Sequence, residues 1–401
     1  MPQQTQSAPE PALTAREVGA LAAGRAEAAE AARSLDPDVV RALLDAGFAR
    51  HFVPVAHGGS GGGFGALTDA VTAIGASCPA TAWCASIALS LSRMAGFLPE
   101  EGRKRIWQDG PDVLVAGSVS PRGRALQADG GWQLTGTWPY VSAVEHSDWA
   151  LVLGLAKTPD APAERRIFAV PRSAYAVERT WSDIGMRATG SHTLTVDDLH
   201  VPGEMSFPVD DLMAGRPSAD GGVSGGAGGV GAGAVGAGGA VAGVPLAAVN
   251  GLFFCLPMLG AAEGALAHWS AYAQDRLRAE RPGVPGPGRA FYEETLARAG
   301  GEIDAARLLL ERIAAVADSG REITALETAR AQRDCALVAD LLVGAVDRLF
   351  RASGTAGHSE SSPLQRLWRD VHSAAGHIVL QFGPNASAYA AQALPVGPSE
   401  P

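Results

Sequence analysis

The 401-residue sequence has few charged residues, few cysteines and no excess of basic side chains. Charged residues make up 18%, and the formal net charge of −10 argues against a nucleic-acid-binding groove. The four cysteines form no CxxC pair, so neither a metal site nor a disulfide framework is indicated. Residues 1–16 are polar and lack the apolar core of a signal peptide, which predicts a cytoplasmic protein.

One long stretch, Gly221–Ala262, contains no charged residue and raises the alternative of a membrane span. Its first half, Gly221–Gly243, is mostly Gly with Ala and Val, which is too flexible for a stable helix. Its second half is interrupted by Asn250 and Pro257. We therefore expect a disordered linker followed by a buried core helix, and no membrane association.

Four regions of different composition follow one another along the chain. Residues 1–112 are predicted to form an N-terminal helical domain and residues 113–212 a middle β-sheet domain. Residues 213–247 form a Gly-rich linker, and residues 248–401 return to helices whose lengths suit a four-helix bundle. The predicted N-terminal helices are Thr14–Ser34, Pro37–Ala46, Ala66–Ala76, Thr81–Leu98 and Glu100–Gln108.

Short β-prone segments separated by Gly, Asp and Pro characterise the middle region. The pair Gly130-Gly131 predicts a hairpin turn, and we expect a small antiparallel sheet. The predicted strands are Val113–Ala116, Ala125–Ala128, Trp132–Thr137, Trp149–Leu155, Arg166–Val170 and His192–Leu199. The predicted C-terminal helices are Leu252–Arg278, Arg289–Asp318, Ile323–Arg351 and Leu364–Phe382.

The Gly-rich tract at residues 58–63 offers the GxGxxA form of a dinucleotide-binding fingerprint through Gly61, Gly63 and Ala66. No βαβ unit with an acidic residue on the second strand surrounds it. A tight loop between helices is therefore the favoured interpretation, and the fingerprint is the alternative.

Two histidines lie near the end of the last predicted helix, within Pro363–His377. On a helix, the five-residue step from His372 to His377 separates them by roughly 140°, so they do not suit one metal ion. One imidazole at the inner end of a buried helix can instead accept a proton near neutral pH. The alternative is a pair of histidines with only structural roles.

Two extended segments place polar side chains on one face. In the predicted strand end Trp138–Ser142, Tyr140 and Ser142 would face the same side, where a ring and a hydroxyl could meet one ligand. A cross-strand aromatic pair is the alternative. In Gly185–Ser191, Arg187 and Thr189 alternate in the same way, and the alternative for Arg187 is an interdomain salt bridge.

The order helices, sheet, linker, long helices, together with these segments, resembles the acyl-CoA dehydrogenase superfamily over about residues 15–390. It is more similar to the branch of two-component flavin-dependent monooxygenases. The resemblance implies an α+β, mostly α fold with an N-terminal helical domain, a middle antiparallel β-domain and a C-terminal four-helix bundle. It also implies a homotetramer, a dimer of dimers, with sites shared between subunits.

The resemblance assigns the flavin contacts. Ser142 would bond near the reactive flavin nitrogen while Tyr140 stacks on the ring. The adenine half of FAD, favoured over FMN, would be received from a neighbouring subunit by the helix break after Phe350, although this chain lacks the family's Gln and paired Gly there. The cofactor-binding residues implied are Ser118, Ser120, Trp138, Tyr140, Ser142, Arg276, Phe350, Ser353, Gly354 and Arg369.

The resemblance also distinguishes two chemistries. Acyl-CoA dehydrogenases carry a catalytic Glu shortly after the Arg-Asp pair, and here Ile378 follows His377 instead. His377 matches a histidine of the monooxygenase branch and, with Ser142, is the implied catalytic residue. The branch often has a second histidine where this chain has Ser90 and Ser92. The substrate-binding residues considered are Ser90, Ser92, His146, Arg187, Thr189 and His372.

The function implied is that of an oxygenase component that takes reduced flavin from a separate NAD(P)H:flavin reductase. With O2 it would form a C4a-hydroperoxyflavin and hydroxylate a phenolic, polyketide or indole-like compound in bacterial natural-product biosynthesis. We also expect the protein to hold oxidised flavin weakly. The alternatives are an acyl-CoA dehydrogenase, an N-oxygenase of an amino sugar and a non-catalytic helical protein.

Overall fold

Five helices precede the sheet in the computed structural model, which describes residues 13–159, 161–217, 241, 243–279 and 287–394. Thr14 begins the first helix with a capping box to Glu17, and Asp36 caps the second. These signals explain why both predicted starts are correct. The helices are α1 (Ala15–Ala32), α2 (Pro37–Asp45), α3 (Phe64–Gly75), α4 (Pro79–Ala95) and α5 (Glu100–Ile106), with the 3₁₀ turn η1 (Val55–His57) before α3.

The Gly-rich tract does not form a phosphate-binding loop. Gly63 precedes α3, and the carboxylate of Asp318, from the C-terminal bundle, accepts the backbone N–H groups of Phe64 and Gly65 at 2.8 Å each. An acidic side chain therefore already occupies this helix N-terminus. The fingerprint alternative is wrong, and the interpretation as a loop between helices is correct.

The middle of the chain forms one seven-stranded sheet, in the order β5-β6-β2-β1-β3-β4-β7. The turn at Asp129-Gly130 joins β1 and β2, and Gly130 has a φ of 67°, as such a turn requires. The strands are β1 (Val115–Ala128), β2 (Gly131–Val141), β3 (Trp149–Lys157), β4 (Glu164–Pro171), β5 (Ala176–Glu178), β6 (His192–Pro202) and β7 (Ser206–Pro208). Short 3₁₀ turns interrupt the loops at η2 (Val144–His146), η3 (Arg172–Ala174), η4 (Arg187–Thr189) and η5 (Gly203–Met205).

One strand pair departs from the predicted antiparallel arrangement. β1 and β3 run parallel, whereas the other pairs of neighbouring strands are antiparallel. The two predicted strands Val113–Ala116 and Ala125–Ala128 are ends of the single strand β1, whose pairing with β3 shifts between Ser118 and Gly123. Pro121, which has no backbone N–H, lies within this shift.

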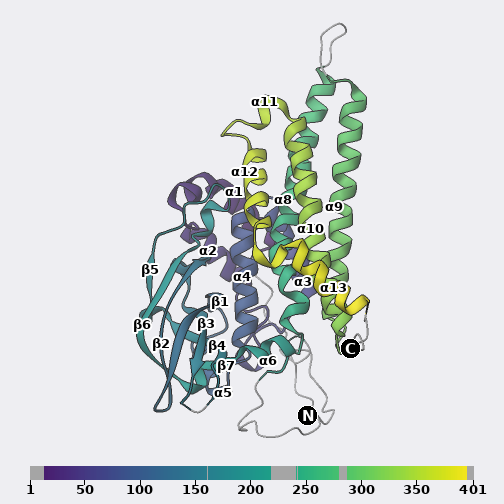
Figure 1. Ribbon diagram of the computed structural model, residues 1–401. Coiled ribbons are helices and arrows are strands. Elements are labelled where there is room, and N and C mark those ends of the chain that lie inside the picture. Colours follow the sequence, from purple (N-terminus) through teal and green to yellow (C-terminus); the bar gives the residue numbers. More distant parts are fainter. Residues whose placement is uncertain (1–12, 160, 218–240, 242, 280–286, 395–401) are drawn as a thin grey trace, which may run out of the picture.

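The C-terminal helices pack beside the sheet (Figure 1). Three of the four predicted long helices are present, and the fourth is not continuous. It ends at Ala375, and His377 and the turn η6 separate it from another helix. The elements are α6 (Val209–Ala214), α8 (Leu246–Arg278), α9 (Arg289–Ala317), α10 (Ala325–Ala352), α11 (Gly354–Gly357), α12 (Pro363–Ala375), η6 (Ile378–Leu380) and α13 (Phe382–Ala393).

Among the described residues, α8 alone is long and apolar enough to cross a membrane. Its most apolar stretch is 83% buried inside the protein, and Pro257 lies within it. This burial explains its composition, because a helix covered on all sides needs no polar face. The predicted buried core helix is correct.

Residues 218–240 of the predicted linker lie outside the described residues. The segments on either side of them lie against each other, because a Cβ atom at Gly215 would overlap the carbonyl of Gly243. The buried guanidinium of Arg93, from α4, donates to the carbonyls of Val241 and Val244. The described residues before and after this segment are therefore next to each other in the fold.

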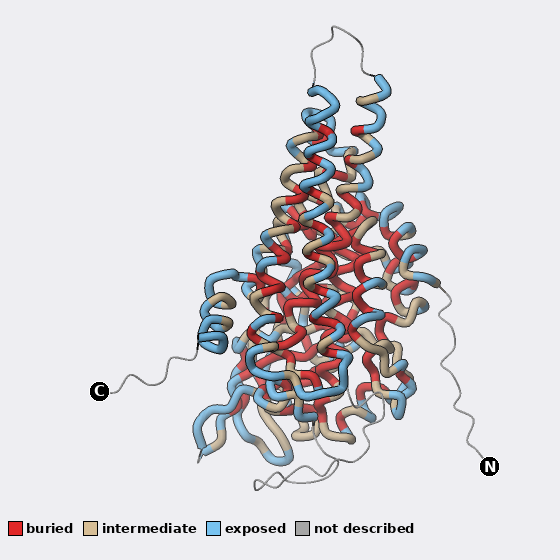
Figure 2. The backbone as a smooth tube through the Cα atoms, turned by 90° about the vertical axis from the view of Figure 1, so that its right-hand side faces the viewer, coloured by how far each residue is buried: buried red, intermediate tan, exposed pale blue. Residues whose placement is uncertain are grey.

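Two apolar cores meet at α4. One combines the N-terminal helices with the C-terminal bundle, and the other fills the sheet and its neighbouring loops. Trp83 and Leu89 belong to the first core, whereas Leu91 and Met94 belong to the second. Figure 2 shows the buried residues concentrated along the middle of the molecule. The predicted α+β, mostly α class is confirmed, and the predicted domain boundaries stay predictions.

Candidate active site

Four side chains form a continuous chain of hydrogen bonds where α4, the end of β2 and η4 meet. The indole Nε1 of Trp83 donates to Ser142 Oγ at 3.1 Å, and Ser142 Oγ lies 2.9 Å from Ser191 Oγ. Ser191 Oγ lies 2.6 Å from Thr189 Oγ1, which donates to the carbonyl of Met186 at 2.9 Å. All four side chains are buried, so this polar chain is satisfied within the protein.

The local backbone turns the side chain of Ser142 inward and that of Tyr140 outward. The pairing of β2 with β6 shifts between Trp138 and Val141, and Tyr140 and Ala143 have φ values of 62° and 56°. As a result Tyr140 is 70% exposed while Ser142 is buried. The expectation that Tyr140 and Ser142 face the same side is wrong, because a positive φ breaks the alternation of a regular strand.

His377 lies at the break after α12, packed against two aromatic rings. Its ring stacks on Phe254 with centroids 3.9 Å apart and lies 6.0 Å from Trp83. Its Nδ1 accepts the backbone N–H of Val379 at 3.3 Å, so the neutral ring carries its proton on Nε2. Burial lowers the pKa of His377 to about 4, which keeps the ring neutral near pH 7.

This geometry opposes the predicted role of His377 as a proton acceptor. The nitrogen that could accept a proton already accepts a backbone N–H, and the other nitrogen bears the proton. His377 can therefore offer an N–H donor to a ligand. The fold nevertheless brings both His377 and Ser142 next to one residue, Trp83, which contacts each of them.

His372 does not share this place. α12 ends at Ala375, so the calculation that treats both histidines as residues of one helix is wrong. His372 Nε2 lies 3.0 Å from Oδ1 of Asp347 on α10, and the same oxygen accepts the indole N–H of Trp368 at 2.7 Å. His372 is thus bonded within the bundle, away from the polar chain at Ser142, and the predicted substrate contact gains no support.

Aromatic rings stack beside His372, at the helix break predicted to receive an adenine. Phe350 stacks on Trp368 with centroids 4.9 Å apart, and His358 lies 4.5 Å from Phe350. Ser353 is buried and its hydroxyl donates to the carbonyl of Leu349. Gly354 has a φ of 54°, which explains the glycine in the break.

The Arg369-Asp370 pair holds the loop that carries Thr189 and Ser191. Arg369 donates to the carbonyl of Ile184 and pairs with Glu30 at 3.0 Å, so its guanidinium is engaged within the subunit. Asp370 accepts the backbone N–H of Met186 at 2.6 Å. Arg369 therefore positions a loop, and its predicted contact with the cofactor stays a prediction.

The loop itself is not extended. Arg187–Thr189 forms η4, flanked by Met186 and Gly190 with positive φ, so the predicted alternation of side chains is wrong. Thr189 points into the polar chain, and Arg187 is half-buried. Among the described residues Arg187 forms no ion pair within 4.0 Å, and its buried Nε has no hydrogen-bond partner. The interdomain salt bridge is therefore not formed.

Two other predicted cofactor residues are placed as follows. Trp138 is 0% exposed and donates its indole N–H to the carbonyl of Leu153 at 2.9 Å, so it fills the sheet core and presents no ring face to a ligand. Arg276 lies over the ring of Tyr272 at 5.2 Å, in the last turn of α8.

The remaining predicted residues are serines. Ser118 and Ser120 are half-buried where β1 pairs irregularly with β3, and Ser118 Oγ accepts the N–H of Ser120 at 3.4 Å. Ser90 and Ser92 are buried in α4, and the hydroxyl of Ser92 has no partner. Neither serine of α4 belongs to the polar chain at Ser142.

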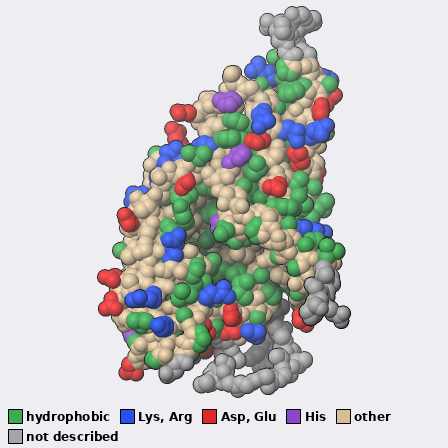
Figure 3. Space-filling view, viewed as in Figure 1, with side chains coloured by type: hydrophobic (Ala, Val, Ile, Leu, Met, Phe, Trp, Pro, Cys, Tyr) green, Lys and Arg blue, Asp and Glu red, His purple; other side chains and the backbone are tan. Residues whose placement is uncertain are grey.

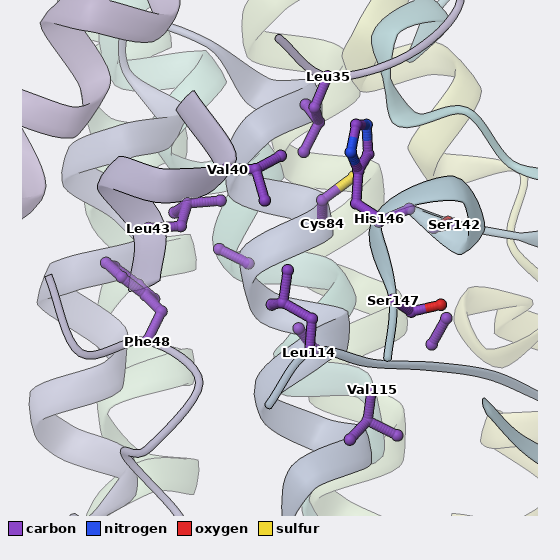
Figure 4. Close-up of a pocket in the computed structure, with 14 residues that line it drawn as sticks. Leu35, Val40, Leu43, Phe48, Cys84, Leu114, Val115, Ser142, His146 and Ser147 are labelled. Atoms are coloured by element: carbon purple, nitrogen blue, oxygen red, sulfur yellow. The ribbon is translucent and has the colours of Figure 1, made fainter. Parts of the chain in front are cut away.

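An apolar cavity lies beside Ser142, between α2, α4 and the start of β1 (Figure 4). Its free volume is about 20 Å³, which is room for about one water molecule. His146 borders it, with Nε2 bonded to Ser34 Oγ at 2.9 Å, and burial lowers the pKa of His146. Ser147 donates to the carbonyl of Val144. The cavity thus offers apolar surface, while its polar side chains bond to the protein.

Sequence reasoning missed Trp83 and Phe254 as parts of the site. Trp83 lies within a predicted apolar helix, and Phe254 is one apolar residue of a predicted core helix. No spacing in the sequence links either to His377. The signal available was that Trp83 is a large donor-bearing ring among small residues of α4, since a buried indole N–H needs a partner.

Side-chain types on the molecular surface support the same location. Figure 3 shows hydrophobic side chains gathered around a hollow between the sheet and the helical bundle. Tyr140 and Ile378 are 70% and 80% exposed, although both are large and apolar. Apolar side chains gathered in one patch of the surface are typical of a ligand or subunit contact. The described residues contain no group of three or more His, Cys, Asp or Glu that could hold a metal ion.

The chain is similar to known proteins over almost its whole length. The family model described as "Acyl-CoA dehydrogenase, C-terminal domain" matches residues 252–382. The FADH(2)-dependent resorcinol hydroxylase, oxygenase component, of Rhizobium sp. is 30% identical over 402 residues, covering 95% of this chain and 93% of that protein.

Two further comparisons agree. The flavin-dependent monooxygenase, oxygenase subunit HsaA, of Mycobacterium tuberculosis is 29% identical, covering 88% of this chain and 87% of that protein. The crystal structure of the HsaA monooxygenase from M. tuberculosis superposes with a TM-score of 0.83 at 26% identity, covering 96% of this chain and all of that one.

Proposed function

Because the chain belongs to the flavin-dependent monooxygenase oxygenase components that share the acyl-CoA dehydrogenase fold, we propose that it hydroxylates an aromatic small molecule with reduced flavin and O2. The observation that carries the proposal is His377, an imidazole and not a carboxylic acid, packed against Trp83, which also bonds to Ser142. We further propose that a separate NAD(P)H:flavin reductase delivers the reduced flavin to this cytoplasmic protein.

The residues around Ser142 fit a flavin ring. Tyr140 offers an exposed aromatic face, and Ser142 retains hydrogen-bonding capacity beyond its bonds to Trp83 and Ser191. Ser118 and Ser120 are partly exposed at the irregular part of β1 and would contact the edge of the ring. Reduced flavin, when bound, supplies the electrons that convert O2 into one hydroxyl oxygen on the substrate and one water.

His377 acts as a hydrogen-bond donor in this proposal. Its Nε2–H would point toward the reacting oxygen atoms, where a fixed donor stabilises developing negative charge. Phe254 holds the ring by stacking, and the surrounding apolar side chains exclude water. Ser142 would fix the flavin ring through a hydrogen bond.

We propose FAD as the preferred flavin. The stacked pair Phe350 and Trp368 offers an aromatic platform for an adenine, which FMN lacks. Arg276, at the end of α8, would bind the diphosphate through its planar guanidinium. We propose that this platform receives the adenine of an FAD whose ring is bound by a neighbouring subunit. The binding sites are then shared between subunits, and we propose that the assembly is a homotetramer.

An aromatic substrate fits the site better than the alternatives. Apart from Ser142, the polar side chains that line this apolar cavity are bonded within the protein, so it matches the hydroxyl and amino groups of an amino sugar poorly. The base that an acyl-CoA dehydrogenase needs is absent after Arg369-Asp370, where His377 and Ile378 stand. We therefore place the substrate among phenolic, polyketide or indole-like natural products of a bacterial biosynthetic pathway.

The proposal is tested with ¹⁸O2, NADH, FAD and a purified flavin reductase, against a panel of phenols and indoles. We expect one ¹⁸O atom in the product, and no product when the reductase is left out. Turnover with NADH alone would contradict the need for a reductase. Failure to oxygenate any aromatic while an acyl-CoA becomes desaturated would replace the proposal with the dehydrogenase alternative.

A further inference from the structure

A proline inside the buried helix α8 leaves one backbone carbonyl without its usual partner. Pro257 has no backbone N–H, so the helical hydrogen bond from residue 257 to the carbonyl of Phe253, four residues earlier, cannot form. Phe253 is 0% exposed, so water does not reach this carbonyl. A buried carbonyl left unpaired costs free energy, and the fold has to supply a donor from elsewhere.

The donor is Ser86 on α4. Its hydroxyl is also fully buried and donates to the carbonyl of Phe253 at 2.6 Å. A serine within a helix often bonds to the carbonyl four residues earlier in its own helix. Here the proton goes to another helix, at the carbonyl that Pro257 frees, and this bond ties α4 to α8 at a defined residue.

The residues beside this bond carry the rings around His377. Phe254 follows Phe253, and Trp83 lies three residues before Ser86, which places it on the same face of α4. Phe254 stacks on His377 with centroids 3.9 Å apart and lies 5.3 Å from Trp83, which is 6.0 Å from His377. The distance between α4 and α8 at the Ser86 bond therefore sets the space that the imidazole occupies.

Helix α3 holds the same part of α8 by backbone contact. A Cβ atom at Gly75 would overlap the carbonyl of Pro257, and a Cβ atom at Gly260 would overlap the carbonyl of Thr72. The two helices are thus packed without intervening side chains at this turn, and α8 has no room to move toward α3. Ser86 fixes the same segment from α4.

We propose that Ser86 and Pro257 together position His377 for the reaction. Pro257 frees the Phe253 carbonyl, and the Ser86 hydroxyl uses that carbonyl to hold Phe254 against the imidazole, which keeps its Nε2–H directed at the reacting oxygen atoms. The inference rests on the proposed function, in which His377 is the donor. Ser86 and Pro257 are positioning residues, because they act through Phe254.

The test is a double-mutant cycle of wild type, Ser86→Ala, Pro257→Ala and the protein with both changes. Ser86→Ala leaves the Phe253 carbonyl without a donor, so α8 shifts until the carbonyl finds another. In Pro257→Ala the backbone N–H of residue 257 returns and donates to this carbonyl, so the hydroxyl of Ser86 is no longer needed. Thr295→Val is the matched control, because it removes a buried hydroxyl that bonds at 2.8 Å within its own helix, α9.

The first measurement follows the position of His377 without turnover. In protein labelled with ¹³C-histidine, the Cε1–H signal of His377 is identified among the nine histidines by its absence from His377→Gln. The ring current of the stacked Phe254 shifts this signal. We expect Ser86→Ala to move it toward the position of an unstacked imidazole, and the double variant to return it to the position found in Pro257→Ala.

The second measurement is the ratio of hydroxylated product to hydrogen peroxide, with the reductase and an aromatic substrate present. Ser86→Ala should lower this ratio about two- to tenfold, as the loss of one hydrogen bond implies, while the affinity for FADH2 stays unchanged. The double variant should match Pro257→Ala to within about twofold. Thr295→Val should leave both the ratio and the His377 signal unchanged.

The inference would be overturned by an unmoved His377 signal in Ser86→Ala, or by a displaced signal with an unchanged product ratio. It would also be overturned by an equal effect of Ser86→Ala in the Pro257→Ala background, or by the same displacement in Thr295→Val. If Ser86→Ala does not fold, Ser86→Cys, a weaker donor of similar size, is judged by the same criteria. A wild type that hydroxylates no aromatic would overturn the proposed function, while the NMR signal would still show whether Ser86 positions His377.

Discussion

At the scale of single residues, His377 combines two properties that are seldom found together. The ring is neutral, because burial lowers its pKa to about 4. Its Nε2 carries the proton and can only donate, because Nδ1 accepts the N–H of Val379. The imidazole therefore does not change its charge near pH 7 and offers the same proton across the neutral range. This behaviour suits stabilisation of charge better than proton abstraction.

Two substitutions of His377 distinguish a donor from a base. His377→Ala removes the N–H, and we expect hydroxylation to fall about 10²-fold, with the flavin electrons released as hydrogen peroxide. His377→Gln keeps an N–H donor but cannot act as a base, so it should retain more product per flavin oxidised than His377→Ala.

The measurement is the ratio of hydroxylated product to hydrogen peroxide, followed from pH 6 to pH 9. Raising the pH should not rescue His377→Ala on a phenol, because no base has been lost. Rescue by high pH, together with a Gln variant as poor as the Ala variant, would restore the role as proton acceptor. Equal coupling in all three proteins would leave His377 a packing residue.

At the scale of elements, α12 holds the loop 181–191 through its backbone and one acid. A Cβ atom at Gly185 would overlap the carbonyl of Arg369, so this contact requires glycine. We expect Gly185→Ala to lower the free energy of unfolding by about 1–3 kcal/mol. Gly24→Ala, in α1 where a Cβ meets nothing within 4 Å, is the control and should stabilise slightly. Urea unfolding checks both, and equal stability of the two variants would contradict the close contact.

Asp370 makes the free energy of unfolding depend on pH through the contact between α12 and the loop 181–191. Burial raises its pKa from 3.8 to about 7, although the hydrogen bond from Met186 opposes the rise. The folded protein therefore binds more protons than the unfolded chain between pH 4 and pH 7, and the cost of the buried carboxylate grows as the pH rises through this range. Below pH 4 the cost is absent.

Asp370→Asn removes this titration while keeping an oxygen that can accept from Met186. We expect its unfolding free energy, relative to the wild type, to increase from pH 4 to pH 7 and then to stay constant. Thermal unfolding of both proteins in matched buffers checks this. A difference independent of pH would show that Asp370 does not titrate in this range.

Much of the helical pattern could be predicted, because caps and hydrophobic periodicity are local signals. Thr14 and Asp36 begin helices where the sequence indicates. The break after Ala375 could not be predicted, since the apolar pattern continues across it. The predicted role of Ser142 stays a prediction, and the positive φ of Tyr140 could not be predicted from a rule based on strand alternation.

At the scale of the whole molecule, the aromatic platform of Phe350 and Trp368 would both select FAD over FMN and lie at a contact between subunits. In the proposed tetramer, Phe350→Ala should weaken FADH2 binding about two- to tenfold and leave FMNH2 binding unchanged, because only FAD carries an adenine. Anaerobic titration with both flavins measures the two affinities, with size-exclusion chromatography to confirm that the assembly persists. Equal loss for both flavins would argue against adenine binding at this platform.

The position of α4 in both apolar cores has a thermodynamic consequence. A sheet and a bundle with separate cores could melt independently, and the angle between them could drift. Here one helix contributes side chains to each, so neither core can open without exposing part of the other. We expect one calorimetric transition whose van't Hoff and calorimetric enthalpies agree, instead of two peaks. The residues from strands and helices that meet at Trp83 therefore keep their relative positions until the whole protein unfolds.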